Sequence, residues 1–201
     1  MEYSLKYQER NQGAHKFIMW LTIASSCMIF AGFTSAFLVR KGAGGAWTGF
    51  DISSVFSIST FIILFSSATM VVAHIANKKG NLGFASFALF LTFACGLLFC
   101  YFQYTGWVYL TNQGFYPAGN PNPSPQFLFV IVIIHAIHVL SGMLFLFIAS
   151  IKSFLLLKSD KQLVVNPNSN VLQVRTDLLS MYWHFMGILW LYLFGFLYFF
   201  L

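Results

Sequence analysis

Four histidines in or beside long apolar stretches are the side chains of this sequence that could do chemistry. His135, His138 and His184 lie within such stretches, and His74 lies near the end of another. Imidazole suits both haem iron and copper, so ligation of a haem or a metal is one hypothesis. The other is that neutral imidazoles hydrogen-bond across helices or to a lipid headgroup, because an ionisable group inside a membrane needs a partner.

The spacing of these histidines favours hydrogen bonding over metal ligation. His135 and His138 share one helix face at i, i+3, whereas a bis-histidine haem needs ligands that approach from opposite sides of the iron. No cysteine, methionine or carboxylate stands beside them at metal-ligand spacing. The acidic residues all lie in tails, loops or at a helix start: Glu2, Glu9, Asp51, Asp160 and Asp177. We therefore expect no catalytic, metal-ligating or cofactor-binding residue in this chain, and no proton path built on a buried carboxylate of its own.

The elements that must position these side chains are five apolar stretches. Of the 201 residues, 58% are hydrophobic and 8% are charged, whereas soluble globular domains carry about 25% charged residues. A helix needs about 20 apolar residues to cross the core of a bilayer. Five stretches meet this length: about 17–39, 55–76, 84–110, 126–150 and 178–201. None of them contains Asp, Glu, Lys or Arg, and all five prolines lie between them. The sequence predicts an all-α fold: residues 1–201 form one integral membrane domain, a bundle of five transmembrane helices.

The basic residues predict how this bundle is oriented. The N-terminal tail, the second loop and the fourth loop together carry nine Lys and Arg, and the opposite side carries only Arg40 and Lys41. Basic residues are concentrated in cytoplasmic loops, so we expect a cytoplasmic N-terminus and a C-terminus on the other, periplasmic side. The net charge of +6 does not indicate nucleic-acid binding, because no run of Lys and Arg exceeds two residues.

Small and polar residues at helical spacing predict which face of each stretch meets its neighbours, because lipid-facing surface is apolar. In chain order these predicted faces are Ser25, Gly32 and Ser35; Thr60, Ser67 and His74; Gly96, Phe99, Gln103 and Gly106; His135, His138 and Gly142; and Ser180, His184, Gly187 and Gly195.

Three motifs resemble those of subunit III of haem–copper oxidases, the cytochrome c oxidase subunit 3 family. The last stretch reads YWHFMGILWLYLF from Tyr182 to Phe194, similar to the final-helix signature of that family. His135 to Gly142 is similar to its H-x-x-H-V-x-x-G block, and Gly96, Phe99 and Gln103 fit G-x-x-F-x-x-x-Q. The similarity runs in colinear order over about residues 15–201. Five spans match the short bacterial form of the family, which lacks the first two helices of mitochondrial members.

The resemblance implies a non-catalytic subunit that holds lipid in a respiratory terminal oxidase. Such an oxidase reduces dioxygen to water and moves protons outward. We expect a cytochrome c oxidase, of aa3 type, with a quinol oxidase as the alternative. The implied partners are the catalytic haem–copper subunit I, subunit II, phospholipids and a larger respiratory supercomplex. Haem and copper are expected in the partner subunits, and the location is the bacterial inner membrane. The residues expected to contact lipid or another subunit are His74, Gln103, His135, His138, Asp177, Tyr182, Trp183, His184 and Trp190.

Three positions depart from the mitochondrial pattern of the family. Gly106 stands where a Glu is common, Gly187 stands where an acid is common, and Ser25-Ser26 replaces a Ser-Glu pair. Roles tied to those acids, proton handling included, therefore do not transfer to this chain. Asp177 lies where the family often has Glu, so one acid is retained.

Two other functions are compatible with five apolar spans. A haem-binding membrane cytochrome would use two of the four histidines as ligands, and a Soret band belonging to the isolated chain would favour it. A small transporter or channel would need a polar path or broken helices, and the sequence contains no such feature.

Overall fold

The computed structural model describes residues 2–44, 54–119, 122–158 and 170–201, with side chains over 13–44, 54–119, 122–155 and 174–201. Every regular element in these ranges is a helix. The five helices are α1 (Glu2–Gly42), α2 (Ser54–Lys78), α3 (Leu82–Asn112), α4 (Pro123–Lys158) and α5 (Asn170–Phe200). The all-α prediction is confirmed.

Each helix contains one segment long and apolar enough to span a membrane, which confirms the predicted five spans. These segments are Gly13–Gly42, Ser54–Lys78, Leu82–Asn112, Pro123–Leu155 and Val174–Phe200. Large apolar side chains cover the outside of the bundle; Met28 is 77% exposed and Phe199 is 80% exposed. Such a surface is costly in water and suits lipid as the surrounding solvent.

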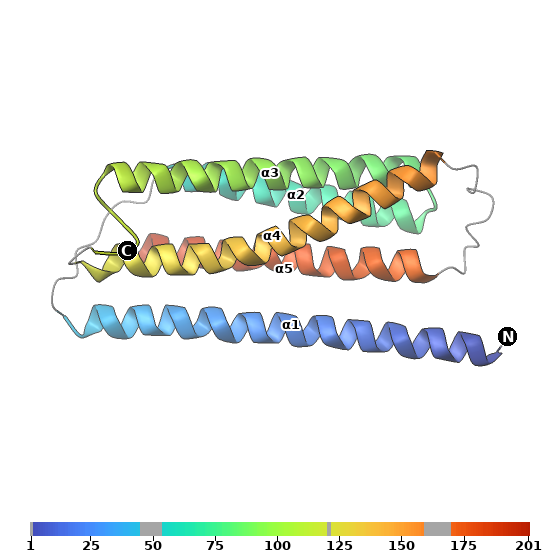
Figure 1. Cartoon of the computed structure of the whole chain (residues 1–201), viewed down its shortest axis with the longest axis horizontal. Helices are drawn as coiled ribbons and strands as arrows, with labels where there is room; N and C mark the ends of the chain where they lie inside the picture. The colour runs from blue at the N-terminus through green and yellow to red at the C-terminus, as the bar shows by residue number, and fades with distance from the viewer. Residues whose placement is uncertain (1, 45–53, 120–121, 159–169) are drawn as a thin grey trace.

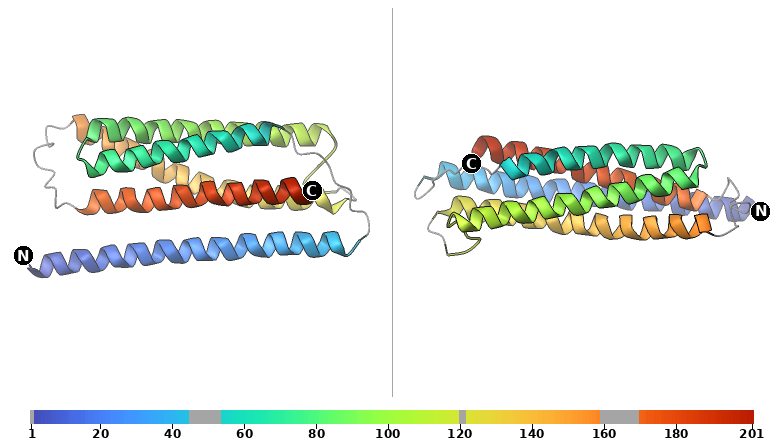
Figure 2. Two further views of the ribbon diagram at one scale, coloured as in Figure 1. Left: turned by 180° about the vertical axis from the view of Figure 1, so that it is seen from behind. Right: turned by 90° about the horizontal axis from the view of Figure 1, so that it is seen from above.

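Four helices form the bundle proper, and the first helix lies against its side. Helices α2 and α3 pair along their length, α3 contacts α4, α4 contacts α5, and α5 contacts α2. In the described part of the chain, α1 packs only on α4 and α5, and Figures 1 and 2 show it running alongside the other helices on their outer side. The core lies where the four inner helices meet, around Trp183, Trp190 and Phe99.

The two termini lie at opposite ends of the bundle (Figure 1), as an odd number of spans requires. One end holds the N-terminus, the α2–α3 turn, the end of α4 and the start of α5; we call it the N-terminal end.

The α2–α3 turn is closed by glycine and asparagine. Gly80 has φ +75°, a left-handed conformation that costs glycine little. The Asn81 N–H bonds the Ala76 carbonyl and the Gly80 N–H bonds the Asn77 carbonyl, which is the Schellman pattern of a helix end. The Asn81 side chain then accepts from the Phe84 N–H at 3.2 Å and caps α3. A short sequence therefore ends one span and starts the next.

Helix α4 begins earlier than the apolar pattern predicts. The prolines were all expected between the spans, but Pro123 and Pro125 lie in the first turn of α4. The first N–H groups of a helix have no partner inside it, so proline is tolerated there. Asn122 stabilises this start, because its side-chain oxygen accepts from the Ser124 N–H at 3.1 Å.

The predicted contact face of α1 is wrong. Ser25, Gly32 and Ser35 are exposed, and the buried face carries Phe30 and Phe37 instead. The small polar residues Ser26 and Thr34 are buried on that face too, and the Thr34 hydroxyl is hydrogen-bonded to the Tyr192 hydroxyl of α5 at 3.0 Å. Gly195 on α5 also fails as a contact, since a Cβ there would meet no described atom within 4 Å.

Candidate functional site

Polar residues two turns apart on α2 face α5, as their spacing predicts. The three contacts are Trp190 Nε1 donating to Thr60 Oγ1 at 2.9 Å, Ser67 Oγ hydrogen-bonded to His184 Nδ1 at 3.0 Å, and His74 Nδ1 paired with Asp177 at 3.3 Å. Seven residues are close to two turns of helix, so all three lie on one face. Four of the nine predicted contact residues therefore make contacts between α2 and α5 inside the chain: His74, Asp177, His184 and Trp190.

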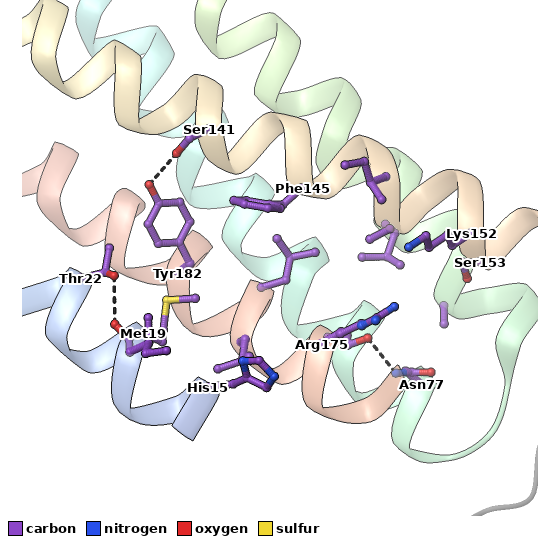
Figure 3. Close-up of a pocket in the computed structure, with 18 residues that line it drawn as sticks. His15, Met19, Thr22, Asn77, Ser141, Phe145, Lys152, Ser153, Arg175 and Tyr182 are labelled. Carbon is purple, nitrogen blue, oxygen red and sulfur yellow. Dashed lines mark hydrogen bonds between the residues drawn. The ribbon is translucent and has the colours of Figure 1, made fainter. Parts of the chain in front are cut away.

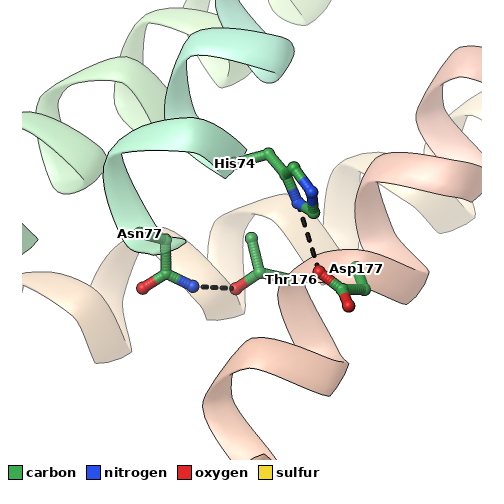
Figure 4. Close-up of polar contacts among 4 residues, drawn as sticks. All are labelled: His74, Asn77, Thr176 and Asp177. Carbon is green, nitrogen blue, oxygen red and sulfur yellow. Dashed lines mark hydrogen bonds and ion pairs between the residues drawn. The ribbon is translucent and has the colours of Figure 1, made fainter. Parts of the chain in front are cut away.

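The His74–Asp177 pair closes this row at the N-terminal end of the bundle (Figure 4). Beside it, Asn77 Nδ2 donates to Thr176 Oγ1 at 3.0 Å. The side chains of His74 and Asp177 are 23% and 32% exposed, so the pair lies at the bundle surface. These two contacts hold the end of α2 against the start of α5.

Trp183 occupies the centre of the bundle with 1% of its surface exposed. Its indole N–H donates to Ser66 Oγ at 3.0 Å. Two glycines make room for it: an added Cβ at Gly96 would lie 3.1 Å from the Trp183 ring, and one at Gly142 would lie 3.4 Å from it. Trp183 and Trp190 thus pack inside the chain and not at a membrane interface.

Tyr182 and His138 join α5 to α4. The Tyr182 hydroxyl donates to the His138 carbonyl at 3.0 Å and lies 2.8 Å from the Ser141 hydroxyl. The His138 ring uses Nδ1 to donate to the Ile134 carbonyl at 2.8 Å, within its own helix. Gly142 allows this approach, since a Cβ there would lie 3.1 Å from the Tyr182 ring.

His135 and Gln103 are buried deeper. His135 is 1% exposed and stacks on Trp190, with ring centroids 5.3 Å apart; Phe30 and Phe99 meet it edge-on. Gln103 donates through Nε2 to Ser59 Oγ at 3.0 Å. His135 and His138, although neighbours in sequence, therefore have different surroundings. Within the described ranges, no group of three or more His, Cys, Asp or Glu is placed to hold a metal ion.

A groove with a volume of about 650 Å³ lies at the N-terminal end of the bundle. Its walls come mainly from α1, α4 and α5 and are largely apolar, including Met19, Phe145 and Leu179. Two cationic side chains, Lys152 from α4 and Arg175 from α5, lie at one end of it near Asn77 (Figure 3). His15 lines the groove from α1, across from Phe145 of α4 (Figure 3).

Most of the predicted contact residues do not line this groove. Tyr182 does, together with Ser141, toward the end opposite Lys152 (Figure 3), while Gln103 and His135 line a separate cavity between α3 and α4. The prediction missed Lys152 and Arg175 as ligand-binding candidates. The sequence shows both charges, but they were used only to predict the orientation of the bundle.

Comparison with known proteins gives the family of the chain. No protein-family model matches it. The chain is 31% identical over 183 residues to cytochrome bo(3) ubiquinol oxidase subunit 3 of Buchnera aphidicola subsp. Baizongia pistaciae, covering 89% of this chain and 88% of that protein. Identity to the subunit of the same name from Pseudomonas aeruginosa is 30%, over 90% and 83% of the two chains. Identity to cytochrome c oxidase subunit 3 of Alkalihalophilus pseudofirmus is 26%, over 93% and 87%. The helix pattern, the α4 and α5 motifs and these relatives together establish that the chain belongs to the subunit III family of haem–copper oxidases.

Proposed function

We propose that this chain is the non-catalytic, lipid-holding subunit of a respiratory haem–copper terminal oxidase in a bacterial inner membrane. It packs beside the catalytic subunit I and subunit II, which hold the haems and copper, reduce dioxygen and pump protons. The N-terminus faces the cytoplasm, as the basic residues indicate. The observation that carries the lipid-holding role is the groove with Lys152 and Arg175 at one end of apolar walls.

A phospholipid fits the chemistry of this groove. Lys152 directly follows the uncharged stretch that ends at Ile151, and Arg175 lies just before the uncharged stretch that begins at Leu178, so both cations lie beside the apolar part of their helices. A lipid phosphate belongs beside these cations, and its acyl chains belong along Phe145 and Leu179. Guanidinium and ammonium groups are the usual protein partners of phosphate.

The charges around the groove support an anionic group between the two cations. Lys152 and Arg175 enter from different helices at the same end of the groove (Figure 3), and like charges placed together repel. No Asp or Glu is among the described residues that line the groove. A lipid phosphodiester bound there would place its negative charge between both cations and join α4 to α5.

Lipid retention tests this proposal directly. The double variant Lys152→Gln with Arg175→Gln should lose phospholipid from the complex purified in mild detergent, measured by native mass spectrometry and by phosphorus analysis. Lys78→Gln with Lys79→Gln is the matched control, because it removes two cations from the same end of the bundle but outside the groove lining. Equal lipid content in the two double variants would contradict the proposal.

Association with a catalytic subunit is tested separately. A tagged chain should co-purify in mild detergent with a large haem-containing subunit, identified by mass spectrometry and by its visible spectrum. Recovery of the tagged chain without any such subunit would contradict the assignment.

A quinol oxidase is the second candidate for the complex. Two ubiquinol oxidase subunits are 30–31% identical to the chain and three others are 24–28% identical, while three cytochrome c oxidase subunits are 26–29% identical. Oxygen consumption by the purified complex distinguishes a cytochrome c oxidase from a quinol oxidase. Turnover with reduced cytochrome c supports the first candidate, and turnover with a quinol alone supports the second.

A further inference from the structure

A cavity between α3 and α4 collects buried polar atoms that have no partner. It has a volume of about 170 Å³ and is lined only by residues of these two helices. Three of its lining residues are Gln103 and Trp107 on α3 and His135 on α4. Gln103 Oε1, Trp107 Nε1 and both ring nitrogens of His135 are buried without a hydrogen-bond partner among the described residues.

The concentration of such atoms at one place is unusual. In the described ranges, six buried side-chain nitrogen or oxygen atoms have no partner, and four of them belong to these three residues. The large majority of buried polar side-chain atoms in proteins are hydrogen-bonded to protein or to ordered water. The other polar atom of the Gln103 side chain does have a partner, since Nε2 donates to Ser59 Oγ at 3.0 Å. The four atoms therefore indicate a ligand that completes their hydrogen bonding.

The donors and acceptors of this site match water. The Gln103 Oε1 atom is an acceptor, the Trp107 indole is a donor, and a neutral imidazole supplies one of each. We propose that this cavity is a hydration site, in which water bridges Gln103 and Trp107 on α3 to His135 on α4. At about 30 Å³ per molecule in the liquid, the volume is enough for several waters. The four atoms are buried side-chain atoms of residues that line the cavity.

The surroundings argue against other occupants. Tyr104 and Leu140 also line the cavity and are 63% and 58% exposed, so it opens on the side of the bundle. An acyl chain entering there would leave the four polar atoms unpaired in hydrocarbon, which is unfavourable. A metal ion has only one imidazole and the thiol of Cys100 among the described lining residues, too few strong ligands for a stable site.

This hydration site would connect α3 to α4 independently of the lipid groove at the N-terminal end. The two sites share no lining residue. The hydration site therefore stands whether or not Lys152 and Arg175 hold a phospholipid.

High-resolution electron cryomicroscopy of the whole oxidase complex tests the proposal. Discrete density peaks should lie about 2.8 Å from a His135 ring nitrogen and from Gln103 Oε1 or Trp107 Nε1. In His135→Phe, which keeps a ring of similar size, the peaks beside position 135 should disappear. Ser141→Ala, on the same helix but outside this cavity, should leave them unchanged. An empty cavity, elongated lipid density or a side chain from another subunit in the unsubstituted complex would overturn the proposal.

Magnetisation transfer from water provides a second test that needs no variant. In the complex with ¹⁵N-labelled tryptophan, the Trp107 indole proton should receive magnetisation from water faster than those of Trp183 and Trp190. The latter two are matched internal controls, because their N–H groups donate to Ser66 and Thr60. Transfer to Trp107 no faster than to these controls would overturn the proposal.

Discussion

Trp183 and Trp190 fill the centre of the bundle because each finds a hydroxyl on α2 for its indole N–H. Trp183 donates to Ser66, and Trp190 donates to Thr60. In hydrocarbon an unpaired N–H is unfavourable, so burial of an indole is favoured where such a partner is in reach. The two rings then set the distance between α2 and α5.

The face that α2 presents to α5 could be predicted from the sequence, whereas most individual partners could not. The spacing of Thr60, Ser67 and His74 depends on the geometry of one helix alone. The partner of Thr60 is Trp190, 130 residues away, and finding it requires the register between two helices. The different environments of His135 and His138 were hidden for the same reason. Their sequence spacing is that of neighbours, but α5 contacts them differently, because Trp190 stacks on His135 and Tyr182 donates to the His138 carbonyl.

Replacing both His135 and His138 with Leu tests whether these histidines hold the chain together or ligate a cofactor. His138 bonds a backbone carbonyl of its own helix and His135 packs among aromatic rings, so we expect weaker attachment to the complex. The haem content per catalytic subunit should not change. The measurement is the ratio of this chain to the catalytic subunit after purification, with the visible spectrum for haem. Loss of haem in proportion to this chain would support the membrane-cytochrome alternative instead.

At the scale of the helices, the number of spans could be predicted because it depends on composition and length alone. The helix ends depend on hydrogen bonds that polar residues make, such as those of Asn122 and Asn81, so the predicted stretches end short of the observed helices. The outward face of α1 could not be predicted, because Ser25, Gly32 and Ser35 resemble a contact stripe and the structure turns them away from α4 and α5.

Two glycines that the sequence places in the same class should respond differently to substitution. Gly142→Val adds atoms where a Cβ would already lie 3.1 Å from the Tyr182 ring, so we expect about 1–3 kcal/mol of destabilisation from overpacking. Gly32→Val is the matched control, because no described atom lies within 4 Å of a Cβ there. Unfolding of the purified chain in mixed detergent measures both. Equal stability of the two variants would show that α4 and α5 do not approach as described.

The orientation of the bundle is a prediction that reporter fusions test. A reporter enzyme that is active only outside the cytoplasm should be active when fused after Leu201, because the C-terminus lies opposite the nine basic residues. Fused after Asn81, in the α2–α3 turn beside Lys78 and Lys79, it should be silent. The reverse pattern would contradict the orientation, and the same reporter activity at both points would contradict the number of spans between them.

At the scale of the whole molecule, the groove between the helices could not be predicted from the sequence. The charge count placed Lys152 and Arg175 on the same side of the membrane, and the structure places both at the same end of the groove. Their meeting in a single groove depends on how α1, α4 and α5 pack, which only the structure provides. The family motifs, in contrast, were visible in the sequence because they are local to α4 and α5.

The central claim is that the chain maintains an oxidase without taking part in its electron transfer. Three observations support this proposal: the helices pack against each other through Trp183 and Trp190, a groove has walls and charges suited to phospholipid, and the chain belongs to the subunit III family. Surface and lipid supplied by such a chain affect how long its partner keeps its structure. They do not affect whether an electron can reach oxygen in that partner.

Oxygen consumption over successive turnovers, compared between the complete complex and a complex depleted of this chain, tests this claim most directly. The depleted enzyme should start near the normal rate and then lose activity progressively, while the complete enzyme keeps turning over. The visible spectrum and metal content must show that both preparations hold the same haems and copper at the start. Immediate and complete loss of oxygen reduction in a depleted complex that retains its haems and copper would show that the chain is catalytically essential, and would contradict the account.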